Sequence, residues 1–197
     1  DTHFSPFETN LDRETALKTL REATAGADDG ELFLERRRSE AMVFDDGRLK
    51  TASYNASEGF GLRAVRSDVT GYAHSTEISE SALKRATATA RLAVAGGGGT
   101  WADAPQATNT KLYTDEDPIA GASFPVKLDT LRAMDDFARS LDKRVVQVTA
   151  SIAASIQEIE ILRPEGGSVR DIRPMTRVNV FIIVEKDGRR ESGSAGG

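Results

Sequence analysis

Side chains that commonly carry chemistry are sparse in this sequence of 197 residues. It contains two histidines and no cysteine. His74 stands three residues before Glu77, so the two could in principle ligate one metal ion. The segment between them runs from a strand end into a helix cap, so the side chains need not share a face. A surface histidine at a strand end is the simpler interpretation, and the two-histidine helical zinc motif is absent.

Glycines form the other groups of interest. Gly96–Gly99 has the composition of a phosphate-binding loop, but such a loop follows a strand and opens a helix, whereas this run follows a helix. We therefore predict a helix stop and a flexible connection. Gly59 and Gly61 lie inside a strand pattern, where glycine either accommodates a bulge or bend or lets another backbone approach closely. No serine has a histidine partner that could activate it, so the residues alone show no catalytic constellation.

Composition and charge are those of a soluble globular protein. Charged residues make up 29% and hydrophobic residues 39% of the chain. A net charge of −5 argues against a general nucleic-acid binder, whose affinity comes from neutralising phosphates. The basic cluster Arg36-Arg37-Arg38 is expected to be a solvated strand end. No apolar stretch is long enough to span a membrane, and the lack of cysteine fits a reducing compartment, so we expect a cytoplasmic protein.

Helical spacing of apolar residues appears in three places. The first helix is expected between the cap Asp12 and Gly26, the second between the cap Ser79 and Gly96, and the third has Pro125 near its first turn. The faces expected to be buried are Ala16, Leu17, Leu20 and Ala23 in the first helix, Leu83, Ala86, Ala90, Ala93 and Val94 in the second, and Leu128, Leu131, Met134, Ala138 and Leu141 in the third.

Strand-like alternation fills most of the remaining sequence. Residues 96–124 show no clear period and predict a long irregular connection that is functional or mobile. Asp46-Gly47 and Asp187-Gly188 are expected to form tight hairpin turns, because both residue types tolerate positive φ angles. The expected strands cover 31–44, 49–55, 59–65 and 69–74, then 145–153, 156–162, 169–172 and 178–185, with a last short strand from Arg190.

The order of elements predicts the fold class. Helix, four strands, helix, long connection, helix and four or five strands form an α+β fold, a mainly antiparallel sheet with about three helices packed on it. Short turns between successive strands favour antiparallel pairing, because parallel pairs need long crossovers.

Short stretches with a distinctive order and spacing extend along nearly the whole chain. They are Ala52-Ser-Tyr-Asn55, Gly59-Phe-Gly-Leu-Arg-Ala-Val65, Gly71-Tyr-Ala73, Leu112-Tyr113 with Asp117-Pro118, Asp142-Lys-Arg-Val145, Val148-Thr-Ala-Ser151, Asp171-Ile-Arg-Pro174 and Asp187-Gly-Arg-Arg-Glu191. Together they resemble the N-terminal domain of the TldD/PmbA family, zinc peptidases long labelled modulators of DNA gyrase. The TldD branch is resembled more than the PmbA branch.

The resemblance implies that residues 1–197 form the N-terminal domain of a longer protein. The zinc motif would then lie in a C-terminal metallopeptidase domain absent from this chain, which would hold no catalytic or metal-binding residue. The family's activity implies an ATP-independent, zinc-dependent peptidase for short or unfolded polypeptides, including peptide-antibiotic maturation and antitoxin turnover. A PmbA/TldE-like subunit would be its partner in a heterodimer, and the gyrase label would be indirect.

Within such a domain, we expect a sheet edge to contact substrate. An extended peptide can add to an edge through main-chain hydrogen bonds, and Gly59 and Gly61 suit a close backbone approach. Tyr54, Asn55 and Arg63 are the expected side-chain contacts. Two other classes of function stay open. One is a non-catalytic interaction module of the PmbA/TldE type, and the other is a direct DNA-binding regulator, which would bind DNA with salt-sensitive affinity.

Overall fold

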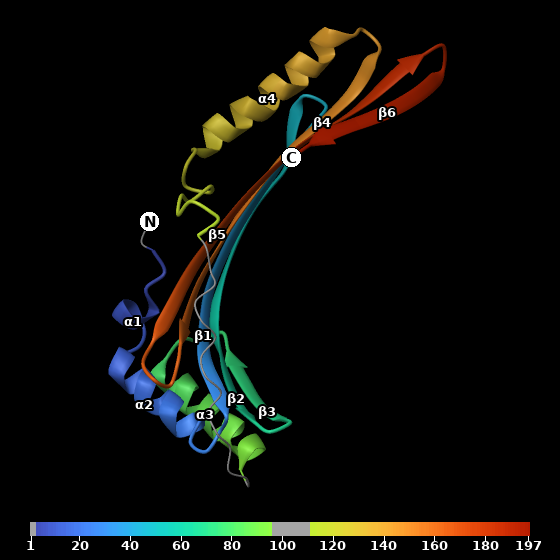
Figure 1. Ribbon diagram of the computed structural model, residues 1–197. Helices are drawn as coiled ribbons and strands as arrows, with labels where there is room; N and C mark the ends of the chain where they lie inside the picture. Colours follow the sequence, from blue (N-terminus) through green and yellow to red (C-terminus); the bar gives the residue numbers. More distant parts are fainter. Residues whose placement is uncertain (1–2, 96–110) are drawn as a thin grey trace. The chain divides into compact units, whose positions relative to one another are not determined.

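The computed structural model describes residues 3–95 and 111–197. Contact clustering divides the chain into two compact units. The first unit consists of 1–37, 57–113 and 157–172, and the second of 38–56, 114–156 and 173–197. The described elements, shown in Figure 1, are α1 (Pro6–Thr9), α2 (Arg13–Ala23), β1 (Asp29–Asp45), β2 (Arg48–Arg66), β3 (Val69–Ser75), α3 (Glu80–Val94), α4 (Phe124–Leu141), β4 (Val145–Leu162), β5 (Ser168–Lys186) and β6 (Arg189–Gly196).

The strands form one six-stranded sheet in the order β3-β2-β1-β4-β5-β6. Registers such as Arg63↔Tyr72 and Val184↔Glu191 show that the β2–β3 and β5–β6 pairs are antiparallel. Cross-strand contacts indicate that β1 and β4 are antiparallel too, because Asp29 at the start of β1 meets Arg163 just after β4, whereas Asp45 at the end of β1 meets Thr149 near the start of β4. The expected antiparallel α+β fold is confirmed.

Both predicted hairpin turns have the expected backbone. Asp46 and Gly47 have φ angles of 49° and 80°, and Asp187 and Gly188 have φ angles of 51° and 78°. Positive φ at two successive positions gives the turn the twist of its flanking strands, and this explains the choice of Asp-Gly. Each turn therefore follows directly from two local residues.

In the first unit, helices cover one face of the sheet, with α2 and α3 side by side (Figure 1). The caps are as predicted, since Asp12 accepts a hydrogen bond from the Thr15 amide at 2.7 Å and Ser79 one from the Ala82 amide at 3.2 Å. The predicted face of α2 is buried throughout, and so is that of α3 at every position whose side chain is described. The buried faces of α2 and α3 pack on apolar side chains of the sheet, namely Leu32, Leu34, Phe60, Leu62 and Leu162.

The second unit has its own small core under α4. Leu131 is fully buried against Met42, Phe44 and Ala150, with Leu128 and Met134 packed beside them. Pro125 lies in the first turn of α4 as expected. The prediction for Leu141 is wrong, because its side chain is 69% exposed at the last position of the helix. The apolar stripe ends one turn before the helix does.

Three predicted interruptions of strands are wrong. Ser57-Glu58 does not divide β2, residues 154–155 do not divide β4, and β5 runs without a break from Ser168 to Lys186. Polar residues such as Ser57 and Glu58 need no turn here, because their side chains project into solvent from a continuous strand. Pro174 is tolerated inside β5 because β6 pairs only with residues 179–186 and leaves this part of β5 at the edge of the sheet.

The described residues contain four helices rather than about three. The additional one, α1, is a single turn that starts at Pro6. It was missed because one turn is too short to show a helical period. Residues 111–123 of the predicted long connection contain no helix or strand, and the Gly96–Gly99 run lies outside the described residues.

Candidate functional site

The five residues predicted to contact substrate all lie on β2, in two different environments. Tyr54 and Asn55 belong to the second unit and are exposed, Tyr54 to 57%. Gly59, Gly61 and Arg63 belong to the first unit and are half-buried or buried. The strand therefore presents only its first part openly to solvent.

The two glycines are approached by the chain's own atoms. A Cβ at Gly59 would lie 2.6 Å from the Ser75 carbonyl oxygen, and one at Gly61 would lie 2.8 Å from the Tyr72 hydroxyl. Other atoms do approach both glycines closely, as expected. These atoms belong to β3 and to Thr76, the residue after it. Backbone atoms crowd Gly59, so a larger residue there would displace β3, whereas at Gly61 the neighbour is the exposed Tyr72 side chain.

Tyr72 and His74 form a small aromatic surface beside Gly61. Their rings stack with centroids 5.8 Å apart and planes 28° apart. His74 is exposed, as expected for a surface histidine at a strand end. Glu77 does not join it, because the Glu77 carboxylate accepts hydrogen bonds from Ser79 and Arg85. The His74–Glu77 spacing therefore produces no shared site.

Arg63 lies in a cage of opposite charges rather than on an open surface. Its guanidinium bonds Asp29 at 2.8 Å and Glu31 at 3.1 Å, and Arg163, the residue after β4, bonds the other oxygens of the same two carboxylates. Burial opposes the charge of Arg63, but hydrogen bonds and attraction from Glu31 and Asp29 raise its pKa. Two guanidiniums and two carboxylates therefore join β1, β2 and the residue that follows β4, a partnership that the separate sequence positions do not reveal.

The arginine cluster on β1 is also structural. Arg36 pairs with Glu158 at 2.9 Å, Arg38 pairs with Asp117 at 2.9 Å, and Arg37 is exposed. The expected alternation is confirmed, but the expected solvated strand end is wrong, because these residues lie in the middle of β1. Carboxylates on later segments of the chain decided the environment of Arg36 and Arg38.

Sequence analysis missed the buried carboxylates of β4. Glu158 accepts a hydrogen bond from the Phe4 amide at 2.9 Å and pairs with Arg36, so it anchors the N-terminal segment. Burial raises the pKa of the neighbouring Glu160, opposed by Arg170 at 3.8 Å. Glu158 and Glu160 alternate in the sequence with the period of the buried face of β4. This spacing was the only feature of the sequence that could have indicated their burial.

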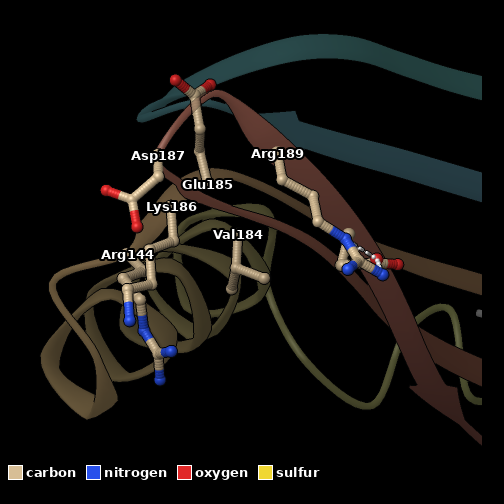
Figure 2. Close-up of a pocket in the computed structure, with 7 residues that line it drawn as sticks. Arg144, Val184, Glu185, Lys186, Asp187 and Arg189 are labelled. Atoms are coloured by element: carbon tan, nitrogen blue, oxygen red, sulfur yellow. Dashed lines mark hydrogen bonds and ion pairs between the residues drawn. The ribbon is translucent and has the colours of Figure 1, made fainter.

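Two surface cavities lie among the described residues of the second unit. The larger, about 740 Å³, is lined by residues from 114–121 and from 174–176. The smaller, about 320 Å³, lies at the β5–β6 turn and is lined by Arg144, Lys186 and Arg189 among others (Figure 2). Arg189 is directed away from Arg144 towards Glu191, and a bidentate hydrogen bond from Arg144 lowers the pKa of Asp142 to about 2. The arginines of the smaller cavity are neutralised separately and do not converge on an anion.

The described residues contain no group of three or more His, Asp or Glu side chains that could hold a metal ion. Nothing in 3–95 or 111–197 therefore fits the zinc that the resemblance implies. Nor does this part of the chain contain a helix whose length and apolar content would allow it to cross a membrane.

Comparison with known families identifies the fold. The model for PmbA/TldA metallopeptidase domain 1 matches residues 30–94, and the model for the PmbA/TldA metallopeptidase central domain matches residues 117–197. The chain belongs to the PmbA/TldD family. The expected family is thus confirmed from matches that cover most of the sequence.

Among curated PmbA/TldD proteins, the chain is similar to the "Metalloprotease TldD homolog" of Buchnera aphidicola from Acyrthosiphon pisum. The two are 33% identical over 183 residues, which cover 92% of this chain and 38% of the relative. The Haemophilus influenzae protein of the same name is 31% identical over 174 residues, with 86% and 36% covered. The chain thus spans less than two fifths of the length of these relatives.

Solved structures of the family share the fold. A Thermotoga maritima protein called a modulator of a DNA gyrase superposes with a TM-score of 0.73 at 15% identity, over 94% of this chain and 42% of that one. TldE from Thermococcus kodakarensis superposes with a TM-score of 0.68 at 14% identity, over 92% and 42%. At such identities these likenesses establish the architecture alone.

Proposed function

We propose that this chain is the non-catalytic, channel-forming and assembly part of a TldD-like zinc peptidase that acts on short or unfolded peptides. The carrying observation is that both of its matched segments belong to metallopeptidase domain models, while its described residues offer no metal-binding group. The zinc site and the catalytic residues would lie in the part of the protein that corresponds to the remaining length of the curated relatives. A PmbA/TldE-like subunit is the proposed partner, and the cytoplasm the proposed location.

The alternative is a non-catalytic interaction module of the PmbA/TldE type. TldE has the same fold, so the architecture is compatible with both functions. The identity of 31–33% to proteins named TldD homologs favours the peptidase. The two functions differ in whether the intact protein binds zinc.

The deciding experiment compares the intact protein with residues 1–197 alone. We expect the intact protein to contain zinc and to cleave a disordered peptide in a chelator-sensitive manner, while residues 1–197 do neither. Metal analysis and peptide cleavage measured by mass spectrometry report the result. An intact, folded protein without zinc and without cleavage would support the interaction module instead.

The peptide contacts predicted at Tyr54, Asn55, Gly59, Gly61 and Arg63 remain a prediction. Gly61→Val is a poor test of them, because the added side chain would collide with Tyr72 and disturb the β2–β3 pair. Tyr54→Ala removes only an exposed side chain, and Tyr72→Ala is a matched control, since these tyrosines are 57% and 59% exposed. If Tyr54 holds peptide, only the first substitution raises the KM of the intact enzyme.

A further inference from the structure

Residues 3–12 lie over the helix-covered face of the first unit, and we call them the N-terminal strap. The strap contains the single-turn helix α1, and it buries Phe4 and Leu11 in the core shared by α2 and α3. Where the strap ends, Arg13 opens α2 and donates a hydrogen bond to the Gly166 carbonyl at 2.8 Å. The helix is therefore fixed to the sheet independently of the strap that precedes it.

Charged side chains of the sheet hold the strap at Phe4. Glu158 of β4 accepts a hydrogen bond from the Phe4 amide at 2.9 Å, and Arg170 of β5 donates one to the Phe4 carbonyl. The guanidinium of Arg36 lies over the Phe4 ring, 5.6 Å from its centroid, which is within the range of a cation–π interaction. One residue of the strap is thus bound through both main-chain groups and through its ring.

A second carboxylate, Glu160, follows on the same face of β4 two residues after Glu158. Its side chain is 10% exposed and lies 3.8 Å from Arg170, a longer separation than the 2.9 Å between Arg36 and Glu158. Arg36, which β1 places on this face, is thus engaged by Glu158. An ion pair at 3.8 Å offsets only part of the cost of taking a carboxylate out of water. Glu160 is therefore buried less favourably than Glu158.

Charged groups face Glu160 from the other elements packed around it. They are Glu8 of the strap, Arg13 of α2 and Arg170 of β5. Burial raises the pKa of Glu160 and Glu8 raises it further, while the two arginines oppose the rise. Because the strap covers this face and carries Glu8, closing it removes Glu160 from water and brings a like charge towards it.

We propose that the N-terminal strap opens as a unit while the rest of the first unit stays folded, and that ionisation of Glu160 favours the open state. Opening returns the carboxylate to water and moves Glu8 away from it. Segments of a protein open locally with free energies below that of global unfolding when few contacts hold them. Here the step requires the release of the bonds to Phe4 and the exposure of a few apolar side chains.

The direction of the pH dependence follows from the linkage between proton binding and closure. Closing raises the pKa of Glu160, so the closed state binds the proton more tightly than the open state does. The closed state is most favoured below the ordinary pKa of 4.5, and this advantage is lost as pH rises through the raised value. The strap should therefore open more often at neutral and alkaline pH than at mildly acidic pH.

Opening changes the chemistry of this face of the sheet. It frees Arg36, Glu158 and Arg170 from Phe4 and uncovers the apolar seat of the Phe4 ring. A face that is sealed when the strap is closed then presents one carboxylate and two guanidiniums beside an apolar seat. The strap thus controls access to this seat.

The test is amide hydrogen exchange, followed by mass spectrometry, in the intact protein that carries these residues. Protection factors are corrected for the intrinsic pH dependence of exchange, and those of 4–12 are compared with those of α3 in the same sample. We expect the protection of 4–12 relative to α3 to fall by roughly threefold or more between about pH 5 and about pH 8. Helix α3 serves as the internal reference because it packs in the same core without belonging to the strap.

Three variants assign the effect to named groups. Glu160→Gln should keep the protection of 4–12 at about pH 8 close to its value at about pH 5, because the amide has no charge to desolvate. Glu14→Gln is the matched control, an exposed carboxylate in the first turn of α2, and should leave the pH dependence unchanged. Phe4→Ala should remove the protection of 4–12 at both pH values while α3 stays protected. Thermal unfolding of each variant shows whether the fold is retained.

Relative protection of 4–12 that is the same at both pH values, or that keeps its pH dependence in Glu160→Gln, would overturn the link to this carboxylate. Loss of protection in α3 together with 4–12 in Phe4→Ala would show that the strap does not open as a unit. The inference does not rest on the proposed peptidase, since exchange requires neither zinc nor cleavage. A protein without peptidase activity would still show the pH dependence, and an active one would still be able to fail the test.

Discussion

The carboxylate of Asp45 joins three strands at the end of β1. It accepts hydrogen bonds from Thr149 at 2.6 Å and Gln147 at 3.2 Å on β4, and from Lys50 at 2.9 Å on β2. The Thr149 bond, followed by those from Lys50 and Gln147, lowers the pKa of Asp45 to about 2. The ionised form is therefore favoured in the folded state.

A lowered pKa makes this contribution to stability dependent on pH. It is fully present above the unfolded pKa of about 3.9 and is lost as pH falls towards about 2. Asp45→Asn should reduce the free energy of unfolding by about 1–2 kcal/mol at pH 7 and by little at pH 2. Urea unfolding at both pH values measures the difference. Asp129→Asn is the control, since its side chain is 71% exposed, and an equal loss there would contradict the prediction.

At the scale of elements, two helices begin with serine but use it differently. Ser79 accepts a hydrogen bond from the Ala82 amide and caps α3, whereas Ser123 at the start of α4 makes no side-chain capping bond. Ser79→Ala should therefore lower the free energy of unfolding by about 1 kcal/mol, and Ser123→Ala should change it little. Denaturant unfolding of the two variants checks this. Equal effects would show that the capping bond contributes nothing.

For the whole molecule, the charge distribution bears on the DNA-binding alternative. The net charge is −5, and Arg36, Arg38, Arg63 and Arg163 are each paired with carboxylates of the same chain. We expect no salt-dependent binding of duplex DNA, because the chain is acidic overall and these four arginines already pair with carboxylates instead of phosphates. Fluorescence anisotropy with labelled DNA at low and high salt measures it. Tight binding that weakens steeply with salt would favour the DNA-binding regulator.

Much of the fold was predictable because its signals are local. The caps Asp12 and Ser79, the buried faces of α2 and α3 and the two Asp-Gly turns each depend on residues within a few positions. The family resemblance was likewise carried by short stretches in a fixed order, and the family models confirm it.

Long-range partners decided the rest. Whether polar residues end a strand depends on what covers its faces, so the continuity of β2 was not visible at Ser57-Glu58. Arg63 was predicted as a substrate contact, yet it pairs with carboxylates on β1 that it shares with Arg163, the residue after β4. Gly61 was expected to admit another backbone, yet the Tyr72 side chain fills that space. In each case the deciding atoms are distant in sequence, and only folding brings them within a few ångströms.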